Sequence, residues 1–441
     1  MGEPHTEVEF HFLRTVKIGT FHIGSSAVDL LVTGVWNRIM IVDLGIAAGP
    51  VAVLSAMRYF LAPLSLWAGY RADTHPIWGS RRLAYIWIGR GLVFVSLPLI
   101  PLSTGFIARG SEYGWLIAFL AFVMFGSGIL ISGPAFLALV HDSAPYNRRG
   151  LAIGIVQFVL VASFALLPLI FARMMPSFDL EAFLQLSLII AVGAGLFWFF
   201  SVWREERPSA PKEDRGFKEA FSGILSDSRA RRYALFLGAS AFFVFMQDAV
   251  LEPFGGDVFG LTVGETTRFN AFWGSGVLLG MVITLLITRR WRPDQQVGTT
   301  MWGLGLLALP LIALGGSAWT ASLAMVRPVL VLFGIGFGIF AVGGVSLLMA
   351  MSGEGRAAIY LALWSVIQLV SRGAGIATGG ILRDAALALT GSFSSTYGFV
   401  FWIEALGALG CIWLLRRVDV SGFASQIGRT APAEPVGMAA D

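Results

Sequence analysis

The segment FVFMQDAVLEPFGGDVFG, residues 243–260, contains two carboxylates inside an otherwise apolar stretch. Asp248 and Glu252 are four residues apart, which on a continuous helix puts two mutually repelling charges on one face. An ionised side chain inside a bilayer is unfavourable unless it is paired or faces water. Three interpretations stay open: an ion-pair cluster that locks parts of a helical bundle together, a proton-coupling or ligand-binding site, and a Glu252 that only reaches the membrane interface beside Pro253.

Other charged and amide side chains also fall inside long apolar stretches. Because such residues are rare in membranes and tend to be functional, they are our candidates for binding a ligand or coupling to protons. They are Asp29, Asn37, Arg38, Arg58, Gln247, Asp248, Glu252, Arg268 and Arg372. Arg372 is expected at mid-span and pointing into a central cavity.

The composition identifies the elements that must position these side chains. Of the 441 residues, 56% are hydrophobic and 13% are charged, whereas soluble domains carry roughly 25% charged residues. Lipid allows only helices or closed barrels to span it, and these stretches lack the alternation of barrel strands. They predict twelve transmembrane helices, roughly at 18–42, 47–70, 83–106, 113–140, 150–174, 181–203, 232–254, 265–288, 297–315, 321–349, 357–382 and 397–415.

Positive charge predicts the orientation of these helices. Twelve spans put both termini on one side, and that side holds 22 of the 31 Lys and Arg residues. The positive-inside rule therefore makes the termini cytoplasmic. The first residues are acidic before they are basic and do not resemble a removable signal peptide.

The longest polar interruption divides the chain into two groups of six spans. We expect a cytoplasmic N-terminal segment at 1–17, a six-helix bundle at 18–203, a linker at 204–231, a second bundle at 232–417 and a disordered tail at 418–441. Apolar residues between 217 and 225 predict either a short amphipathic helix on the membrane surface or a plain solvated linker.

A shift of 210 residues aligns the two halves. It places Gln247 on Asn37, Asp248 on Arg38 and Arg383 on Arg173. Two parallel six-helix repeats are the architecture of the major facilitator superfamily, so the predicted fold class is an all-α membrane protein of that superfamily. In it, spans one, two, seven and eight meet on the non-cytoplasmic side. We therefore expect Asp248 to pair with Arg38, and Glu252 to pair with Arg268 or Arg58.

A loop between the second and third spans supports this fold. GYRADTHPIWGSRR, residues 69–82, resembles the signature loop of the superfamily. Gly69 would permit close helix contact, Asp73 would cap a neighbouring helix, and Arg81 and Arg82 would bind carboxylates or lipid phosphates.

The remaining reactive residues give little sign of catalysis. The five histidines have no zinc-ligand spacing, and the single cysteine, Cys411, is expected to be buried in packing. We expect an interfacial or hydrogen-bonded role for His22 and His141, with ligation of a tetrapyrrole magnesium as the alternative. No catalytic residues, metal site, nucleotide-binding loop or nucleic-acid partner is predicted, so we do not expect an enzyme.

Several segments carry a more specific likeness. NRIMIVDLG at 37–45, the loop at 69–87, QDAVLEPFGGDVFGLTVGETT at 247–267 and RDAALALTGS at 383–392 together resemble the PucC/LhaA family. The third segment is the most specific. The resemblance implies functional roles for Asn37, Arg38 and Asp43, for the loop residues, and for Gln247, Asp248, Glu252, Gly255 and Gly256.

The resemblance also implies a function. Proteins of this family support assembly of bacterial light-harvesting antenna complexes and are described as delivering bacteriochlorophyll. It implies residence in the photosynthetic inner membrane, with antenna polypeptides, bacteriochlorophyll, bacteriochlorophyll synthase and membrane lipids as partners, and with pigment as a transferred rather than covalently bound ligand. The alternative is a proton-coupled carrier of a small or hydrophobic solute, with Asp29 or Asp248 as the coupling carboxylate. Spans four and ten offer almost no polar residues, which favours a greasy ligand.

Overall fold

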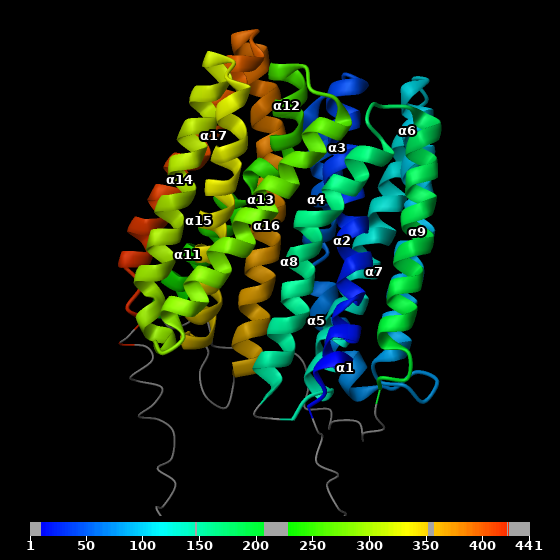
Figure 1. Cartoon of the computed structure of the whole chain (residues 1–441), viewed down its shortest axis with the longest axis vertical. Helices are drawn as coiled ribbons and strands as arrows, with labels where there is room; N and C mark the ends of the chain where they lie inside the picture. Colours follow the sequence, from blue (N-terminus) through cyan, green and yellow to red (C-terminus); the bar gives the residue numbers. More distant parts are fainter. Residues whose placement is uncertain (1–9, 146–147, 207–227, 352–356, 421, 423–441) are drawn as a thin grey trace, which may run out of the picture.

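The chain folds as an antiparallel bundle of long helices in a computed structural model (Figure 1). The structure describes residues 10–145, 148–206, 228–351, 357–420 and 422. Twelve helical stretches are long and apolar enough to cross a membrane, as the sequence predicts. The first residues of the first span and the last of the twelfth lie at one end of the bundle, which we call the terminus end, at the bottom of Figure 1.

The first six spans contain these helices. Their bounds are α1 Phe12–Gly19, α2 Phe21–Asp29 and α3 Trp36–Arg38 for span one, with π-helical turns at Leu30–Val35 and Ile39–Asp43; α4 Ala48–Phe60 and α5 Pro63–Thr74 for span two; then α6 Leu83–Ala108, α7 Tyr113–Asp142, α8 Arg149–Met174 and α9 Leu180–Val202.

The last six spans follow the same order. Their bounds are α11 Ser228–Val244 and α12 Leu251–Phe259 for span seven, with a 3₁₀ turn at Met246–Ala249 between them; then α13 Val263–Thr288, α14 Val297–Thr320, α15 Leu323–Ala350, α16 Ala357–Thr390 and α17 Phe393–Arg416, with a further 3₁₀ turn at Pro293–Gln296. The expected surface helix at 217–225 and most of the expected tail lie outside the described residues.

The two groups of six spans correspond in order, although not at one constant shift. Corresponding spans begin 210 to 216 residues apart, and spans one and seven, Phe12–Asp43 and Ser228–Phe259, begin and end 216 residues apart. The single shift of 210 residues therefore misaligns these two spans, so its superposition of Asp248 on Arg38 does not hold.

Proline divides two of the spans. Pro63 stands at the first position of α5, where its missing N–H removes no helical hydrogen bond. Pro253 occupies the first turn of α12, and the chain before it is a 3₁₀ turn rather than α-helix. A continuous helix would bring the proline ring against the carbonyl of residue 249, so span seven breaks there. Asp248 and Glu252 are consequently not on one helix face.

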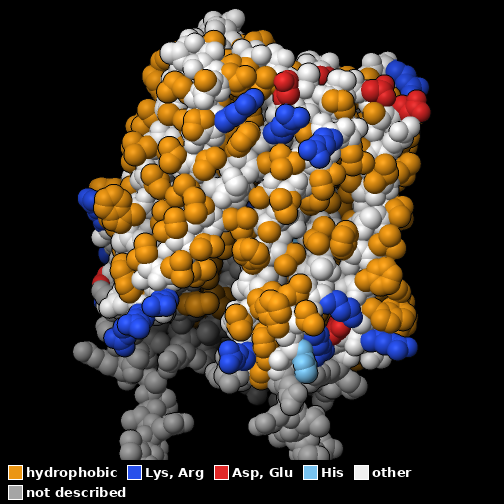
Figure 2. All heavy atoms as spheres, in the orientation of Figure 1, with side chains coloured by type: hydrophobic (Ala, Val, Ile, Leu, Met, Phe, Trp, Pro, Cys, Tyr) orange, Lys and Arg blue, Asp and Glu red, His pale blue; other side chains and the backbone are white. Residues whose placement is uncertain are grey.

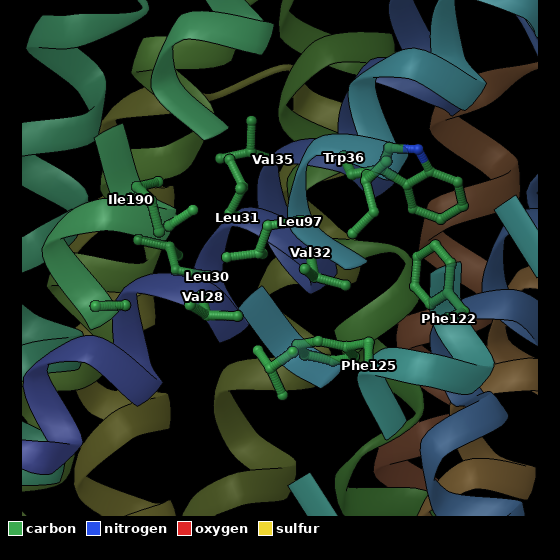
Figure 3. Packing of buried hydrophobic residues seen from close by; sticks show 14 of the residues in the cluster. Val28, Leu30, Leu31, Val32, Val35, Trp36, Leu97, Phe122, Phe125 and Ile190 are labelled. Carbon is green, nitrogen blue, oxygen red and sulfur yellow. The ribbon is translucent and has the colours of Figure 1, made fainter. Parts of the chain in front are cut away.

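The apolar core consists of two clusters, one mainly of first-half residues and one mainly of second-half residues. In the first half, span one packs against spans three, four and six through residues that include Val28, Leu31, Leu97, Phe122 and Ile190, which converge in Figure 3. On the face shown in Figure 2, hydrophobic side chains cover most of the middle, and charged side chains gather mainly toward the two ends. This distribution fits a protein whose middle lies in lipid.

Candidate functional site

A cavity of about 490 Å³ lies between the two halves. We call the mostly polar lining from spans one, two, three, seven and eleven the polar wall, and the mostly apolar lining from spans four, five, eight and ten the aromatic wall. Six of the nine candidate residues line it: Asp29, Arg58, Gln247, Asp248, Glu252 and Arg372. Arg372 points into a central cavity, as expected from the sequence.

One ion pair on the polar wall joins spans one and two. Arg58 donates to the carboxylate of Asp29 and also to the hydroxyl of Tyr59. Its guanidinium lies 4.5 Å from the centre of the Tyr59 ring. In a low-dielectric environment each charge is tolerated because the other is present.

A second ion pair joins spans seven and eleven. Arg372 Nη2 donates to Asp248 Oδ2 at 3.0 Å, and its guanidinium lies over the rings of Phe245 at 3.8 Å and Tyr59 at 4.9 Å. The expected pairing of Asp248 with Arg38 is therefore wrong. The break in span seven turns Asp248 toward α16. Arg38 lies nearer the end of the bundle that is opposite the termini.

Glu252 has a neutral partner. Asn270 Nδ2, on α13, donates to Glu252 Oε1 at 2.6 Å, and Oε2 has no hydrogen-bond partner among the described residues. Gly34, on span one, is close enough that an added Cβ would collide with the same carboxylate. The expected pairing of Glu252 with Arg268 or Arg58 is wrong, because Arg268 is exposed and does not line the cavity, and Arg58 is held by Asp29.

Gln247 completes the wall of span seven. Its side-chain amide donates to Asp248 Oδ1 at 2.8 Å, and its backbone N–H donates to Glu404 Oε1 on α17 at 3.1 Å. The amide thus orients the carboxylate of the second ion pair. Glu404 accepts a hydrogen bond from the backbone at the point where the helix is broken.

Asn37 joins the halves at the break in span seven. Its side-chain nitrogen donates to the carbonyl oxygen of Ala249 at 2.8 Å. In an unbroken helix that carbonyl would accept from the N–H of residue 253, which a proline lacks. Asn37 therefore supplies from the first half the donor that Pro253 removes from the second.

Further contacts between the halves gather at the end opposite the termini, the upper end in Figure 1. Arg38 pairs with Asp43 within span one, and its Nη2 donates to the carbonyl of Leu261 at 2.6 Å. Asp384, on α16, accepts from the backbone N–H groups of Ala48 and Gly49 at 2.9 and 2.7 Å. A carboxylate of the second half thereby caps a helix of the first half, where the helix dipole favours negative charge.

The family-block glycines allow close packing at this end. A Cβ on Gly255 would lie 2.7 Å from Thr266 Cγ2, and one on Gly256 would lie 2.7 Å from Val42 Cγ1. Nearby, Arg383 Nη2 and the Tyr397 hydroxyl both donate to Asp257 at 2.6 Å. Within the segment 247–261, Ala249, Gly256 and Leu261 contact the first half, Gly255 and Asp257 contact the second half, and Asp248 and Glu252 line the cavity.

The aromatic wall of the cavity is mostly apolar. Its rings come from Phe136 on α7, Phe164 on α8, Trp273 on α13 and Phe337 on α15. Spans four and ten contribute only apolar residues and Gly133 to the lining, as their sequences predict. A Cβ on Gly133 would meet no atom within 4 Å, so this glycine leaves part of the cavity free.

The signature loop, residues 69–82, lies at the terminus end. Gly69 packs against Pro134 of α7, and Asp73 pairs with Arg82 at 2.5 Å and with Arg81 at 3.6 Å. Arg82 also reaches Asp142 at 3.4 Å. The arginines bind carboxylates, as expected.

Glu206 is the residue that caps the third span. Its carboxylate accepts from the backbone N–H groups of Arg81, Arg82 and Leu83 and from Ser80 Oγ, the last at 2.5 Å. Burial opposes its ionisation, but the hydrogen bonds from Ser80 and these N–H groups outweigh burial and lower the pKa of Glu206. The neighbouring Glu205 binds Arg14 and Lys17 at 2.5 and 2.7 Å.

The two candidate histidines have different surroundings. His141 is half exposed and lies 3.3 Å from Asp142, in line with an interfacial role. His22 lines the cavity, and neither ring nitrogen has a hydrogen-bond partner in the part of the chain that the structure describes. Among the described residues, His22 therefore has no hydrogen-bonded role. No group of three or more His, Cys, Asp or Glu residues suited to a metal ion occurs among the described residues.

The sequence shows a specific relationship to known proteins. The family model described as PUCC protein matches residues 35–423, nearly the whole helical bundle. The chain belongs to the PucC family. A PucC protein of Rhodovulum sulfidophilum is 28% identical over 87% of each chain. A protein of Rhodobacter capsulatus named bacteriochlorophyll synthase 44.5 kDa chain is 28% identical over 90% of this chain and 92% of its own.

Solved structures show the wider fold. A POT family transporter in complex with 5-aminolevulinic acid has a TM-score of 0.70 at 15% identity, with 96% of this chain and 98% of that chain covered. A D-xylose–proton symporter has a TM-score of 0.66 at 15% identity, with 92% and 96% covered. This PucC-family protein is therefore a multi-pass membrane protein with the fold of the major facilitator superfamily.

Several partners of the site were not predicted from the sequence. Asn270, Asp257, Asp384 and Glu206 each hold a residue or helix end described above. Asp257 and Asp384 lie inside the family-like segments, so the resemblance could have drawn attention to them. Asn270 is an amide inside a predicted span, the same signal that selected Asn37 and Gln247, and could have been found in that way. Glu206 carries no local signal, because only the packing of separate segments brings it to its partners.

Proposed function

We propose that this protein assists the assembly of bacterial light-harvesting complexes by binding bacteriochlorophyll in the cavity between its halves and passing it to antenna polypeptides. The proposed location is the photosynthetic inner membrane, with both termini in the cytoplasm, since most Lys and Arg residues flank the terminus end of the spans. Its role is non-catalytic, and bacteriochlorophyll synthase and membrane lipids are the further proposed partners.

The observation that carries the proposal is the aromatic wall of the cavity. Phe136, Phe164, Trp273 and Phe337 come from four different spans and converge on one cavity. Binding cavities of about 300–1,000 Å³ with mainly apolar linings and a few polar groups are typical of sites for small molecules and cofactors. A flat, apolar ring system is the ligand that such a wall accommodates best.

The proposal is tested by deleting the gene in a phototrophic bacterium and recording the near-infrared absorbance of its membranes. We expect weakened antenna bands that return when the wild-type gene is restored. Normal antenna bands in the deletion strain would refute the assembly role.

A matched pair of glycine variants assigns the effect to the cavity. Gly133→Phe would fill the cavity, whereas Gly91→Phe adds the same ring at an exposed position outside it; neither Cβ meets an atom within 4 Å. We expect the first variant to leave the antenna bands weak and the second to restore them. If both variants restored the antenna bands equally, antenna assembly would not depend on the cavity.

A proton-coupled carrier is the second candidate, and the two ion pairs favour it. Asp29 with Arg58 and Asp248 with Arg372 face the same cavity, where protonation of either Asp would release an arginine. In the carrier, Asp29→Asn or Asp248→Asn would abolish function while pigment stays unbound in every variant. In the assembly factor, gently extracted wild-type protein would carry pigment, which its absorbance spectrum reports.

A further inference from the structure

A second group of polar side chains lies in the cavity apart from the two ion pairs. His22, on α2, and Arg90, on α6, both line the cavity. Both also contact the ring of Phe21, His22 with ring centres 6.1 Å apart and the Arg90 guanidinium 4.5 Å from the ring centre. The assembly role and the carrier role described above use neither side chain.

Arg90 is a buried cation for which we find no counter-charge. Its side chain lies between aromatic rings, with the guanidinium 4.8 Å from the centre of the Trp198 ring, and the residue is 6% exposed. Among the described residues, no carboxylate lies within ion-pair distance of it, and its Nε has no hydrogen-bond partner. Contacts with aromatic faces compensate about 2 kcal/mol of a desolvated charge, which is less than the several kcal/mol that burial of an ion demands.

The carboxylates that line the cavity already have partners. Asp29 is held by Arg58, Asp248 by Arg372, and Glu252 by the amide of Asn270. None of these carboxylates is ion-paired with Arg90, so among the described residues its guanidinium remains a donor toward the cavity, and an anionic ligand would supply its counter-charge. Guanidinium groups bind carboxylates through two parallel hydrogen bonds, which makes arginine well suited to this task.

His22 adds a second polar contact beside this cation. Both ring nitrogens are buried without a partner in the described part of the chain, and the ring meets Phe136 edge-on at 5.1 Å between centres. Phe136 itself is part of the aromatic wall of the cavity and stacks on Phe21 at 3.9 Å. A ligand body lying against Phe136 would therefore lie near the imidazole as well as the guanidinium.

We propose that Arg90 binds a carboxylate of the ligand, with His22 as the neighbouring polar contact and the apolar body of the ligand against Phe136. This deepens the proposed function and rests on it for the identity of the ring system. It means that the protein takes the pigment as a free acid, with its propionate side chain not yet esterified. An enzyme that joins this propionate to an alcohol, with loss of water, must then act after this binding step and before the pigment reaches antenna polypeptides as bacteriochlorophyll.

The test compares two probes that differ only in this charge: bacteriochlorophyllide with a free propionate, and its methyl ester. Binding is measured by quenching of tryptophan fluorescence in nanodiscs of zwitterionic phosphatidylcholine. We expect the acid to bind about tenfold or more tightly than the ester, since a hydrogen-bonded charge contributes at least this factor. Equal affinities for the two probes would overturn the inference while leaving the proposed function intact, and binding of neither probe would refute both.

Two variants test whether Arg90 causes the preference for the acid over the ester. Arg90→Met should remove it by weakening the acid alone, and Arg268→Met should leave it unchanged, because Arg268 is exposed and outside the cavity. An Arg90→Met protein that folds and keeps the preference would contradict the assignment. Should that variant not fold, the comparison of acid with ester on the wild-type protein decides the matter without it. In nanodiscs that contain phosphatidylglycerol, displacement of the acid by the lipid would reassign Arg90 to a lipid headgroup.

Discussion

The side-chain amide of Asn37 donates a hydrogen bond of 2.8 Å to the carbonyl of Ala249, although the two residues belong to different halves of the chain. The carbonyl is free to accept because Pro253 has no N–H to offer it. A sequence feature that breaks one helix is thus compensated by a polar residue in another. This hydrogen bond joins the two halves at the break in span seven.

Asn37→Ala should destabilise the protein by about 1–3 kcal/mol, because it leaves a buried carbonyl without a donor. Pro253→Ala restores a backbone N–H at the position that could serve this carbonyl. We therefore expect Asn37→Ala to be less destabilising in a Pro253→Ala background. Thermal unfolding of the four proteins of this double-mutant cycle in one detergent measures the coupling, and additive effects would show that the two residues do not share the carbonyl.

Asp248→Asn should lower stability and impair antenna assembly, because it leaves Arg372 facing the cavity without its counter-charge. The loss should be smaller than the about 3–5 kcal/mol seen when a fully buried ion pair is broken, since 28% of Arg372 and 25% of Asp248 are exposed. The measurements are thermal unfolding and the near-infrared spectrum of a complemented deletion strain. Lost assembly with unchanged unfolding would assign Asp248 to function rather than packing. Arg268→Gln, at an exposed position, is the control.

Gly256→Ala should destabilise the contact between the halves. The new methyl group would lie 2.7 Å from Val42 Cγ1 on span one, so the helices must separate, at a cost of about 1–3 kcal/mol. Gly91→Ala is the matched control, because its Cβ would meet no atom within 4 Å. A lower unfolding temperature for the first variant only is the expected result. Equal unfolding temperatures for the two variants would mean that span one moves aside at no cost in stability.

Glu206 should make stability depend on acid pH. Its pKa is lower in the folded protein than its ordinary value of 4.5, so its contribution is fully present above that pH and is lost as pH falls through the lowered pKa. Glu206→Gln should therefore unfold at a lower temperature than wild type at neutral pH, and the difference should shrink below about pH 4. Unfolding temperatures measured across this range test it, with the exposed Glu112→Gln as control. If the difference in unfolding temperature stayed the same in acid, the charge of Glu206 would not be its cause.

Some residues of the site could be identified from the sequence, whereas their partners could not. Asp29, Asp248 and Arg372 could be identified as site residues because a charge inside an apolar span is conspicuous by itself. The pairing of Asp248 was mispredicted because the shift that relates the halves is not constant, and because the 3₁₀ turn before Pro253 rotates Asp248 away from the face it would share with Glu252. Pro253 is visible in the sequence, but the direction in which the broken helix turns is not.

The amino-acid sequence by itself determined the membrane class, the twelve spans and their grouping by six, and the family, because these depend on hydrophobic length and on local motifs. It also identified the apolar character of spans four and ten. Only the tertiary structure decided that Arg372 rather than Arg38 holds Asp248, that Glu206 caps the third span, and that Arg90 faces the cavity with no ion-paired carboxylate among the described residues. Such partners are set by the rotation and depth of helices far apart in the chain, and these depend on packing between whole surfaces.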